Sequence, residues 1–383
     1  MIGLGSPSTG AASFTIAGRN NGFAKADTRA ATLASVRAYR EAMASFAQMR
    51  TMDIWYAHLD EDELMASIRA TVAGAAKQEK TAKKQERTDR RDKAPKKQDK
   101  RAAKQEKTAK QDEKTAKAAE KRAAKTAEKA HTRDSLQALS KLAELVDGQY
   151  RIVSQPPIIV PARDLASTYG LSADDVVPVL HDQFRAYRAT LQDDRRKLLE
   201  RFQFVDAARK VVGVGSVGTR AFIVLLEGRD ARDPLFLQIK EATASVLEDY
   251  LPKSKYRQHG ERVVQGQRMM QAASDIYHGW TKGLDVRRHF YWRQLRDMKG
   301  SVEVDTLQPL GLNFYAGICG WTLARAHARS GDPVAMAEYL GDTDEWDESI
   351  TDFCERYADQ NERDYKEFVT AIKSGKLKAV EGV

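Results

Sequence analysis

The feature that most restricts how this chain can fold is a low-complexity segment at residues 77–133, built mainly from Lys, Ala, Glu, Gln and Thr. It contains no Leu, Ile, Val, Phe, Trp, Tyr or Met, so it has no large apolar side chain to bury against a core. Glu and Lys side chains recur at the i,i+4 spacing that stabilises an isolated helix, and Pro95 interrupts that pattern. We therefore expect a solvated helix or a disordered insertion here, with globular structure before and after it.

The same segment accounts for the basic character of the protein. Residues 77–133 carry 22 basic and 10 acidic side chains, whereas the rest of the chain carries 41 basic and 44 acidic ones. The globular part is thus slightly acidic, although the whole chain has a formal net charge of +9. Runs of charge are commonly only solvated, and this one lacks the aromatic side chains on which bases stack. Binding of nucleic acid or another polyanion through residues 77–133 is an alternative that we do not favour.

Neither membrane insertion nor disulfide chemistry is indicated. The longest apolar run, residues 221–226, is far shorter than the roughly 20 residues that span a bilayer, and the N-terminus lacks the pattern of a secretory signal. The two cysteines, Cys319 and Cys354, form neither a disulfide framework nor a CxxC pair, and the seven histidines show no metal-binding spacing. We expect a cytoplasmic protein without membrane contact and without a metal centre in its own residues.

Helical spacing of apolar residues dominates both ends of the chain. Residues 29–49 show this spacing, and Asp332-Pro333 begins a helix that Gly341 ends. Asp134 is expected to cap a helix, and Ser172-x-x-Asp175 to open a further helix that runs toward Phe204. We expect an α+β protein, with a mostly helical body and a small antiparallel sheet. The expected regions are a disordered N-terminus at 1–12, a helical segment at 13–76, the insertion at 77–133, a helical and extended connector at 134–208, a β-meander region at 209–305 and a helical region at 306–383.

The meander is predicted where the apolar period changes from helical to alternating. Residues 221–226 are apolar and rich in β-branched side chains, and residues 235–240 alternate between two faces. Turn-forming residues at 228–234 separate the two runs. The pattern predicts a three-stranded antiparallel meander beginning at Arg209, and a further short strand at 289–295.

Three glycines, Gly213, Gly215 and Gly218, form G-x-G-x-x-G at the first turn of this meander. A dinucleotide-binding loop would be followed by a helix, but a strand follows here, and Thr219-Arg220 replaces the Lys-Ser or Lys-Thr of a P-loop. The context is typical of the hairpin that covers the nucleotide in kinases, where main-chain N–H groups approach phosphate oxygens and the hydroxyl of Ser216 adds a donor. The alternative is a tight hairpin that needs positive φ angles and binds nothing.

Lys240 is the second part of this candidate nucleotide site. It follows Gly218 by 22 residues and ends the third strand, where a kinase-type sheet carries the lysine that binds the α- and β-phosphates. The acid that orients such a lysine belongs on the next helix, and we assign this role to Glu248, with Glu261 as the second choice. Glu241 is adjacent in the strand and should point to the opposite face. The alternative for Lys240 is a solvated charge or an ion-pair partner.

With these residues and several further segments, the chain resembles the bacterial family known as domain of unknown function 2252. The resemblance covers nearly the whole chain outside residues 1–12 and 77–133. The matching segments are SFTIAGRNNGF from Ser13, TRDSLQALSKL from Thr132, RKVVGVGSVGTR from Arg209, PLFLQIKEA from Pro234, FYWRQLRDMKGS from Phe290, CGWTLARAHARSGD from Cys319 and YADQNERDY from Tyr357.

The resemblance implies a kinase-like fold. In that family the segment before SFTIAGR normally carries G-D-x-H-x-x-N-F-G and then D-x-N-D-F-D, which look like the catalytic loop and metal-binding motif of aminoglycoside-phosphotransferase-like kinases. Because these motifs precede the glycine loop, the fold would be circularly permuted. The present sequence begins at MIGLGSPSTG and joins the family pattern at Ser13, so both motifs are missing.

The resemblance therefore implies an N-terminally incomplete family member. We expect a pseudoenzyme that binds ATP with Mg²⁺ but has no catalytic residues, because phosphoryl transfer needs acids that hold the metal and an aspartate that orients the nucleophile. The alternative is a non-enzymatic binding or scaffold protein that uses its basic segment. The phosphoryl acceptor and the oligomeric state are not indicated by the sequence.

Overall fold

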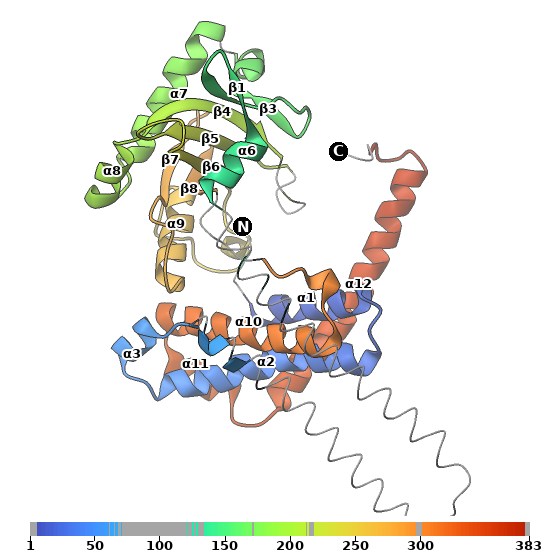
Figure 1. Ribbon diagram of the computed structural model, residues 1–383. Coiled ribbons are helices and arrows are strands. Elements are labelled where there is room, and N and C mark those ends of the chain that lie inside the picture. The colour runs from blue at the N-terminus through green and yellow to red at the C-terminus, as the bar shows by residue number, and fades with distance from the viewer. Residues whose placement is uncertain are drawn as a thin grey trace, which may run out of the picture.

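The computed structural model describes residues 6–60, 134–170, 172–211, 213, 218–295 and 301–379, together with the positions 62–64, 66, 67, 70, 121, 125 and 128. Figure 1 shows two parts, a sheet lobe that contains strands β1–β8 and a helical body beside it. The α+β class and the mostly helical body with a sheet are as the sequence predicts. Nearly all of the segment 77–133 lies outside the described residues, so its expected structure stays a prediction.

The helical body combines helices from both ends of the described chain. It consists of α1 (Pro7–Asn20), α2 (Lys25–Ala47), α3 (Thr51–Tyr56), α10 (Pro309–Ser330), α11 (Pro333–Leu340) and α12 (Glu345–Lys373). Helices α2 and α10 lie so close that a Cβ added to Gly320 would collide with the backbone carbonyl of Ser35. Around this contact the buried side chains of Tyr39, Met43 and Phe46 pack against α10 and α11. Asp332 caps α11 and Gly341 follows its end, as predicted.

Helix α1 corrects the expectation of a disordered N-terminus at residues 1–12 for positions 7–12, and positions 1–5 lie outside the described residues. It begins at Pro7, where the side chain of Ser6 accepts a hydrogen bond from the N–H of Ser8. Ala11 and Ala12 are 0% and 3% exposed, and they pack against Cys354 of α12 and Val36 of α2. The small side chains that obscured an apolar pattern in the sequence are the ones that allow this close helix contact.

Buried and half-buried charges in the helical body pair with each other. The carboxylate of Asp347 is 0% exposed and accepts hydrogen bonds at 3.0 and 2.8 Å from Nε and Nη2 of Arg40. Arg29 forms ion pairs with Glu348, Asp352 and Glu355 along α12. These contacts join α2 to α12, and therefore the two ends of the chain.

The sheet lobe is built on one six-stranded antiparallel sheet with the order β3-β4-β5-β6-β8-β7. Its strands are β3 (Ile159–Pro161), β4 (Gln203–Lys210), β5 (Ala221–Glu227), β6 (Pro234–Ala242), β7 (Gly279–Lys282) and β8 (His289–Gln294). Strands β4, β5 and β6 form the predicted meander, but β4 begins at Gln203 and not at the expected Arg209. Strand β8 is the predicted later strand. Strands β3 and β7 extend the sheet at its two edges.

Each face of this sheet is covered by a different set of helices. On one face, Val224, Leu237 and Trp292 pack with Phe184 and Tyr187 of α7 (Ala173–Arg188). On the other face, Ile223, Leu225 and Phe236 pack with Leu139 of α6 (Ser135–Leu142) and with Ile152 of the hairpin β1–β2 (Ala143–Val146, Gln149–Ile152). Helix α9 (His259–Met270) covers the end of this second face, where Val263 and Val264 contact Ala242 and Tyr291. The two covered faces define two separate sides on which a ligand could bind.

Residues 134–208 are not a connector but a substantial part of the sheet lobe. Asp134 caps α6 as predicted, yet the helix ends at Leu142, and the chain turns through Asp147-Gly148 with φ angles of 51° and 80°. Two successive positive φ angles suit the turn of a two-residue hairpin. The capping box of Ser172 and Asp175 opens α7, but the long helix expected as far as Phe204 is divided into α7 and α8 (Asp193–Leu199).

Two arginines of α10, Arg325 and Arg329, join the helical body to the sheet lobe. Arg325 is 3% exposed and donates hydrogen bonds to the carbonyl groups of Trp55, Ala57 and Met270. Arg329 donates to the carbonyl of Gln271, 2.6 Å away. Met270 and Gln271 lie at the C-terminal end of α9, so the guanidinium groups that bind them lie at the negative end of this helix's dipole. This contact fixes the sheet lobe on the helical body.

Candidate functional site at the loop end of the sheet

The glycine segment is a hairpin connection, as the sequence predicts. Strand β4 ends at Lys210, and the antiparallel strand β5 begins at Ala221. Gly213 and Gly218 have φ angles of +51° and +83°, and a Cβ added at either would meet no atom within 4 Å. Both glycines are therefore required for the backbone angle and not for space. Gly215 and Ser216 lie outside the described residues, so their roles stay predictions.

Lys240 lies at the end of the sheet from which this loop emerges. Its register partner in β5 is Ala221, the first residue of that strand, and its partner in β8 is Tyr291. Alternation along β6 places Lys240 on the face that carries Phe236 and Ala242, the face covered by α6 and α9. The lysine is half-buried. The sheet therefore brings Lys240 and the ends of the glycine loop together.

The two acids considered as partners of Lys240 lie in different surroundings. Glu248 is in the short 3₁₀ helix η4 (Val246–Asp249), and its Oε1 accepts a hydrogen bond of 3.4 Å from the N–H of Ser254. Glu261 is in the first turn of α9, which is the first α-helix after β6. The choice between these acids stays a prediction.

Glu241 points to the opposite face, as strand alternation requires, and its carboxylate binds two arginines on that side. Its carboxylate is 6% exposed. Oε1 accepts from Nη1 of Arg288 at 2.6 Å, and Oε2 accepts from the backbone N–H of Arg220 at 2.9 Å. The guanidinium of Arg220 lies 3.7 Å from the same oxygen. One nearly buried carboxylate thus anchors two arginines where β5, β6 and β8 come together.

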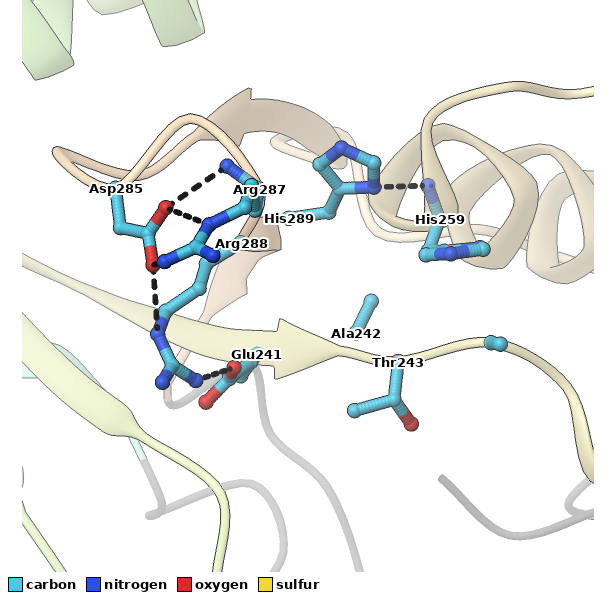
Figure 2. Close-up of a pocket in the computed structure, with 9 residues that line it drawn as sticks. Glu241, Ala242, Thr243, His259, Asp285, Arg287, Arg288 and His289 are labelled. Carbon is cyan, nitrogen blue, oxygen red and sulfur yellow. Dashed lines mark hydrogen bonds and ion pairs between the residues drawn. The ribbon is translucent and has the colours of Figure 1, made fainter.

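A polar pocket of about 450 Å³ lies beside this ion-pair group (Figure 2). It is lined by the end of β6, the start of α9 and the turn before β8. Nδ1 of His289 accepts a hydrogen bond of 3.0 Å from the N–H of His259, so the neutral imidazole of His289 carries its proton on Nε2. Burial, and then the nearby His259 and Lys282, lower the pKa of His289 below its ordinary value. The hydrogen bond accepted at Nδ1 and the lowered pKa both favour the neutral form of the ring.

Asp285 supplies the second carboxylate of this pocket (Figure 2). It accepts hydrogen bonds from the side chain of Arg287 at 3.1 and 3.3 Å, and this bonding lowers the pKa of the carboxyl. The Nε of Arg288 lies 3.6 Å from Asp285. The pocket therefore gathers two arginines and two histidines around two carboxylates. Lys240 does not line it.

Local sequence patterns did not indicate that His259, His289 and Arg288 belong to one site. The register pairs Ala242 of β6 with His289 of β8, which brings residues far apart in the chain to one end of the sheet. The predicted strand at 289–295 was the available signal, because pairing this strand with β6 would have placed His289 at the same end of the sheet as Ala242. Its pairing partner was not indicated by the local sequence.

The described residues offer no cluster of three or more His, Cys, Asp or Glu side chains that could hold a metal ion. Nor does any helix in the described part of the chain have the length and apolarity needed to cross a membrane.

Comparison with family models identifies a family for this chain. A model for the family DUF2252, described as an uncharacterized protein conserved in bacteria, matches residues 9–113 and 92–371. Comparison with curated proteins and with solved structures finds no significant match.

Proposed function

The chain belongs to the DUF2252 family of uncharacterised proteins conserved in bacteria, and we propose that it binds a nucleoside triphosphate in a kinase-like manner at the loop end of its sheet. The ligand would be ATP with Mg²⁺. Its phosphates would bind main-chain N–H groups of the loop 213–218 and the amine of Lys240.

The observation that carries this proposal is the register of β5 and β6. Lys240 pairs with Ala221, three residues after Gly218, so the lysine and the glycine hairpin share one end of the sheet. A loop with glycine at both described ends gives close access to its backbone N–H groups, which is how nests of N–H groups bind anions. A lysine on the adjacent strand supplies the positive charge that such a site needs.

The order of elements after the loop supports the same proposal. Lys240 lies in the third strand of the meander, in the sequence Leu-Gln-Ile-Lys, and the strand continues beyond it to Ala242. Helix α9 follows before β7 and β8. Kinases place their phosphate-binding lysine in the third strand and its partner acid on the next helix. On this analogy Glu261, at the start of α9, becomes as good a candidate for that acid as Glu248.

Binding without turnover is the activity that we propose for this polypeptide. Phosphoryl transfer depends on acids that hold Mg²⁺ against the triphosphate and on an aspartate that orients the nucleophile. The two motifs to which the family resemblance assigns these roles have no counterpart in the 383 residues. The lysine contact contributes about 1.5–3 kcal/mol, and micromolar affinity requires about 8 kcal/mol, so contacts with the base and the loop must supply the rest.

Thermal unfolding tests the proposal with a matched pair of variants. Mg-ATP at 100 times its dissociation constant should stabilise the protein by about 2.7 kcal/mol and raise the melting temperature. Lys240→Ala should abolish the shift, whereas Lys282→Ala, an exposed lysine at the same end of the sheet in β7, should preserve it. No shift of the wild-type protein at millimolar Mg-ATP would refute nucleotide binding.

The basic segment supports a second candidate function, the binding of a polyanion such as nucleic acid. The segment carries 22 basic and 10 acidic side chains. Basic side chains that neutralise phosphates would release the counterions of the nucleic acid, so the affinity should fall steeply with salt. Deletion of residues 77–133 should remove binding to DNA or RNA if this function is correct. Binding that survives the deletion would refute it.

A further inference from the structure

The face of the sheet opposite Lys240 contains a second, apolar cavity of about 280 Å³. The sheet supplies one wall and the segment from η1 (Ala162–Leu165) to α7 supplies the other. Protein interiors seldom leave voids much larger than a water molecule, which occupies about 30 Å³. The apolar lining side chains include Leu165, Val176, Leu180, Phe222, Val224, Ile239, Phe290 and Trp292.

Most of the wall of this cavity is apolar and offers few partners to water, and its polar side chains are those of Gln183, Arg220, Thr281, Asp285 and Arg288. The one indole N–H in the lining, that of Trp292, already donates to Oγ1 of Thr281 at 2.9 Å. Backbone groups of the sheet are bonded to neighbouring strands. A buried water molecule needs two to four polar partners, so an apolar group is the better occupant.

The cavity has a buried end and a charged mouth. Val224 and Trp292 are 1% and 2% exposed, whereas Leu284, which also lines the cavity, is 48% exposed. The side chains of Arg220 and Arg288 line the mouth and are 36% and 39% exposed. An elongated ligand could therefore place an apolar end on Trp292 and a polar end between the two arginines.

The charge at the mouth favours an anion. Arg220 and Arg288 share the single carboxylate of Glu241. The other acid at the mouth, Asp285, lies closer to Arg287, at 3.1 Å, than to Arg288, at 3.6 Å. Two guanidinium groups that share one carboxylate keep donors for a further anion, and arginine binds carboxylates with two parallel hydrogen bonds.

From this geometry we infer that the cavity binds a small amphipathic carboxylic acid. The apolar body lies against Val224 and Trp292, and the carboxylate contacts Arg220 and Arg288. The volume of the cavity is at the lower end of the range for small-molecule pockets. It therefore favours a ligand with an alkyl chain of medium length over one with a long alkyl chain. The inference is independent of nucleotide binding, because Lys240 lies on the other face of the sheet.

Calorimetric titration of the full chain with hexanoate, octanoate and decanoate tests this site. Each buried methylene should strengthen binding about fourfold until the cavity is filled. The primary alcohol that matches the tightest acid should bind about tenfold more weakly or worse, because it lacks the charged hydrogen bonds. Equal affinity for acid and alcohol, or an affinity that does not rise with chain length, would overturn the proposal.

Three variants locate the binding site. Val179→Trp fills the cavity and should weaken binding at least tenfold, whereas Val177→Trp, two residues earlier on α7 and 53% exposed, should not change it. Arg220→Gln leaves the core untouched and should weaken the acid about tenfold without affecting the alcohol. Lys240→Ala should leave the affinity for the acid unchanged. If Arg220→Gln bound the acid with wild-type affinity, the acid would bind elsewhere on the protein, and the inference would be refuted.

Discussion

The helical body and the sheet lobe use their buried carboxylates in different ways. In the helical body, Asp347 is 0% exposed and both of its oxygens bond Arg40, which is 11% exposed, so these two charges neutralise each other at the contact between helices. The more exposed Arg37 lies 3.8 Å from the same carboxylate. In the sheet lobe, Glu241 is almost as buried, but its partners Arg220 and Arg288 are more than one-third exposed and line cavities. The first arrangement stabilises a fold, and the second presents charge where a ligand can reach it.

The helical body is also more closely packed than the sheet lobe. Helices α2 and α10 approach until Gly320 meets the backbone of Ser35. The sheet lobe instead leaves a polar pocket and an apolar cavity on either side of the pair formed by Glu241 and Arg288. We therefore propose that the helical body is the support and that the sheet lobe is the part that binds ligands.

Replacement of Asp347 should have the largest effect on stability. Asp347→Ala leaves Arg40 buried without its partner, and breaking a buried ion pair costs about 3–5 kcal/mol. Urea unfolding monitored by circular dichroism measures the change. The control Asp352→Ala removes a carboxylate that is 53% exposed and should cost about 0–1 kcal/mol. Equal losses in the two variants would contradict the view that closed charge pairs hold the helical body together.

Two glycines of α10 give the next largest contrast. Gly320→Ala forces α10 away from α2 and should destabilise the protein by about 1–3 kcal/mol. Gly317→Ala lies on the same helix with no atom within 4 Å of the new Cβ, and should stabilise it by about 0.5–1 kcal/mol. Thermal unfolding of both variants gives the sign. A stabilising Gly320→Ala would show that the helices are not closely packed.

In the sheet lobe, Tyr187→Phe tests a buried hydrogen bond without changing the packing. The hydroxyl of Tyr187 is fully buried and donates to the carbonyl of Tyr277 at 2.6 Å, and the ring stacks on Trp292. Loss of the hydroxyl should cost about 1 kcal/mol. Tyr250→Phe, at a position that is 86% exposed, is the control and should have no effect in the same unfolding experiment. A neutral Tyr187→Phe would show that this bond adds nothing to the lobe.

The smallest expected effect is a pH dependence that arises in the sheet lobe. Burial lowers the pKa of His289 in the folded protein, so as the pH falls below about 6.5 the unfolded chain takes up this proton first. The stability from His289 is therefore present above that pH and is lost below it. His289→Asn keeps an acceptor for the N–H of His259, and should flatten the fall in stability between pH 7 and pH 5. An unchanged pH profile would contradict the prediction.

The sequence predicts the parts of this fold that depend on local pattern. The meander, the strand at 289–295, the helix between Asp332 and Gly341 and the caps at Asp134 and Ser172 are confirmed. The start of helix α1, before the helical segment predicted from Ser13, was missed because its buried residues Ala11 and Ala12 are small. Strand β7 was missed because four residues at a sheet edge carry little pattern. The hairpin β1–β2 had a local signal in Asp147-Gly148, which the sequence analysis did not use.

The candidate site was predictable only as far as one strand and its loop. Gly213, Gly218 and Lys240 belong to a single meander, so their proximity follows from alternation and turn length. The contact of Glu241 with Arg288 depends on the pairing of β6 with β8, between which the chain forms α9 and β7. Such a register is decided by the packing of the whole lobe, and no short segment of sequence contains it.

The affinity of the full chain for Mg-ATP, measured by isothermal titration calorimetry beside that of Lys240→Ala, tests the central claim most directly. We predict measurable binding by the wild-type protein and a dissociation constant at least about tenfold higher in the variant, the loss expected for one charged hydrogen bond to phosphate. Equal dissociation constants for the two proteins would contradict the assignment of Lys240 and the loop 213–218 to one phosphate-binding site.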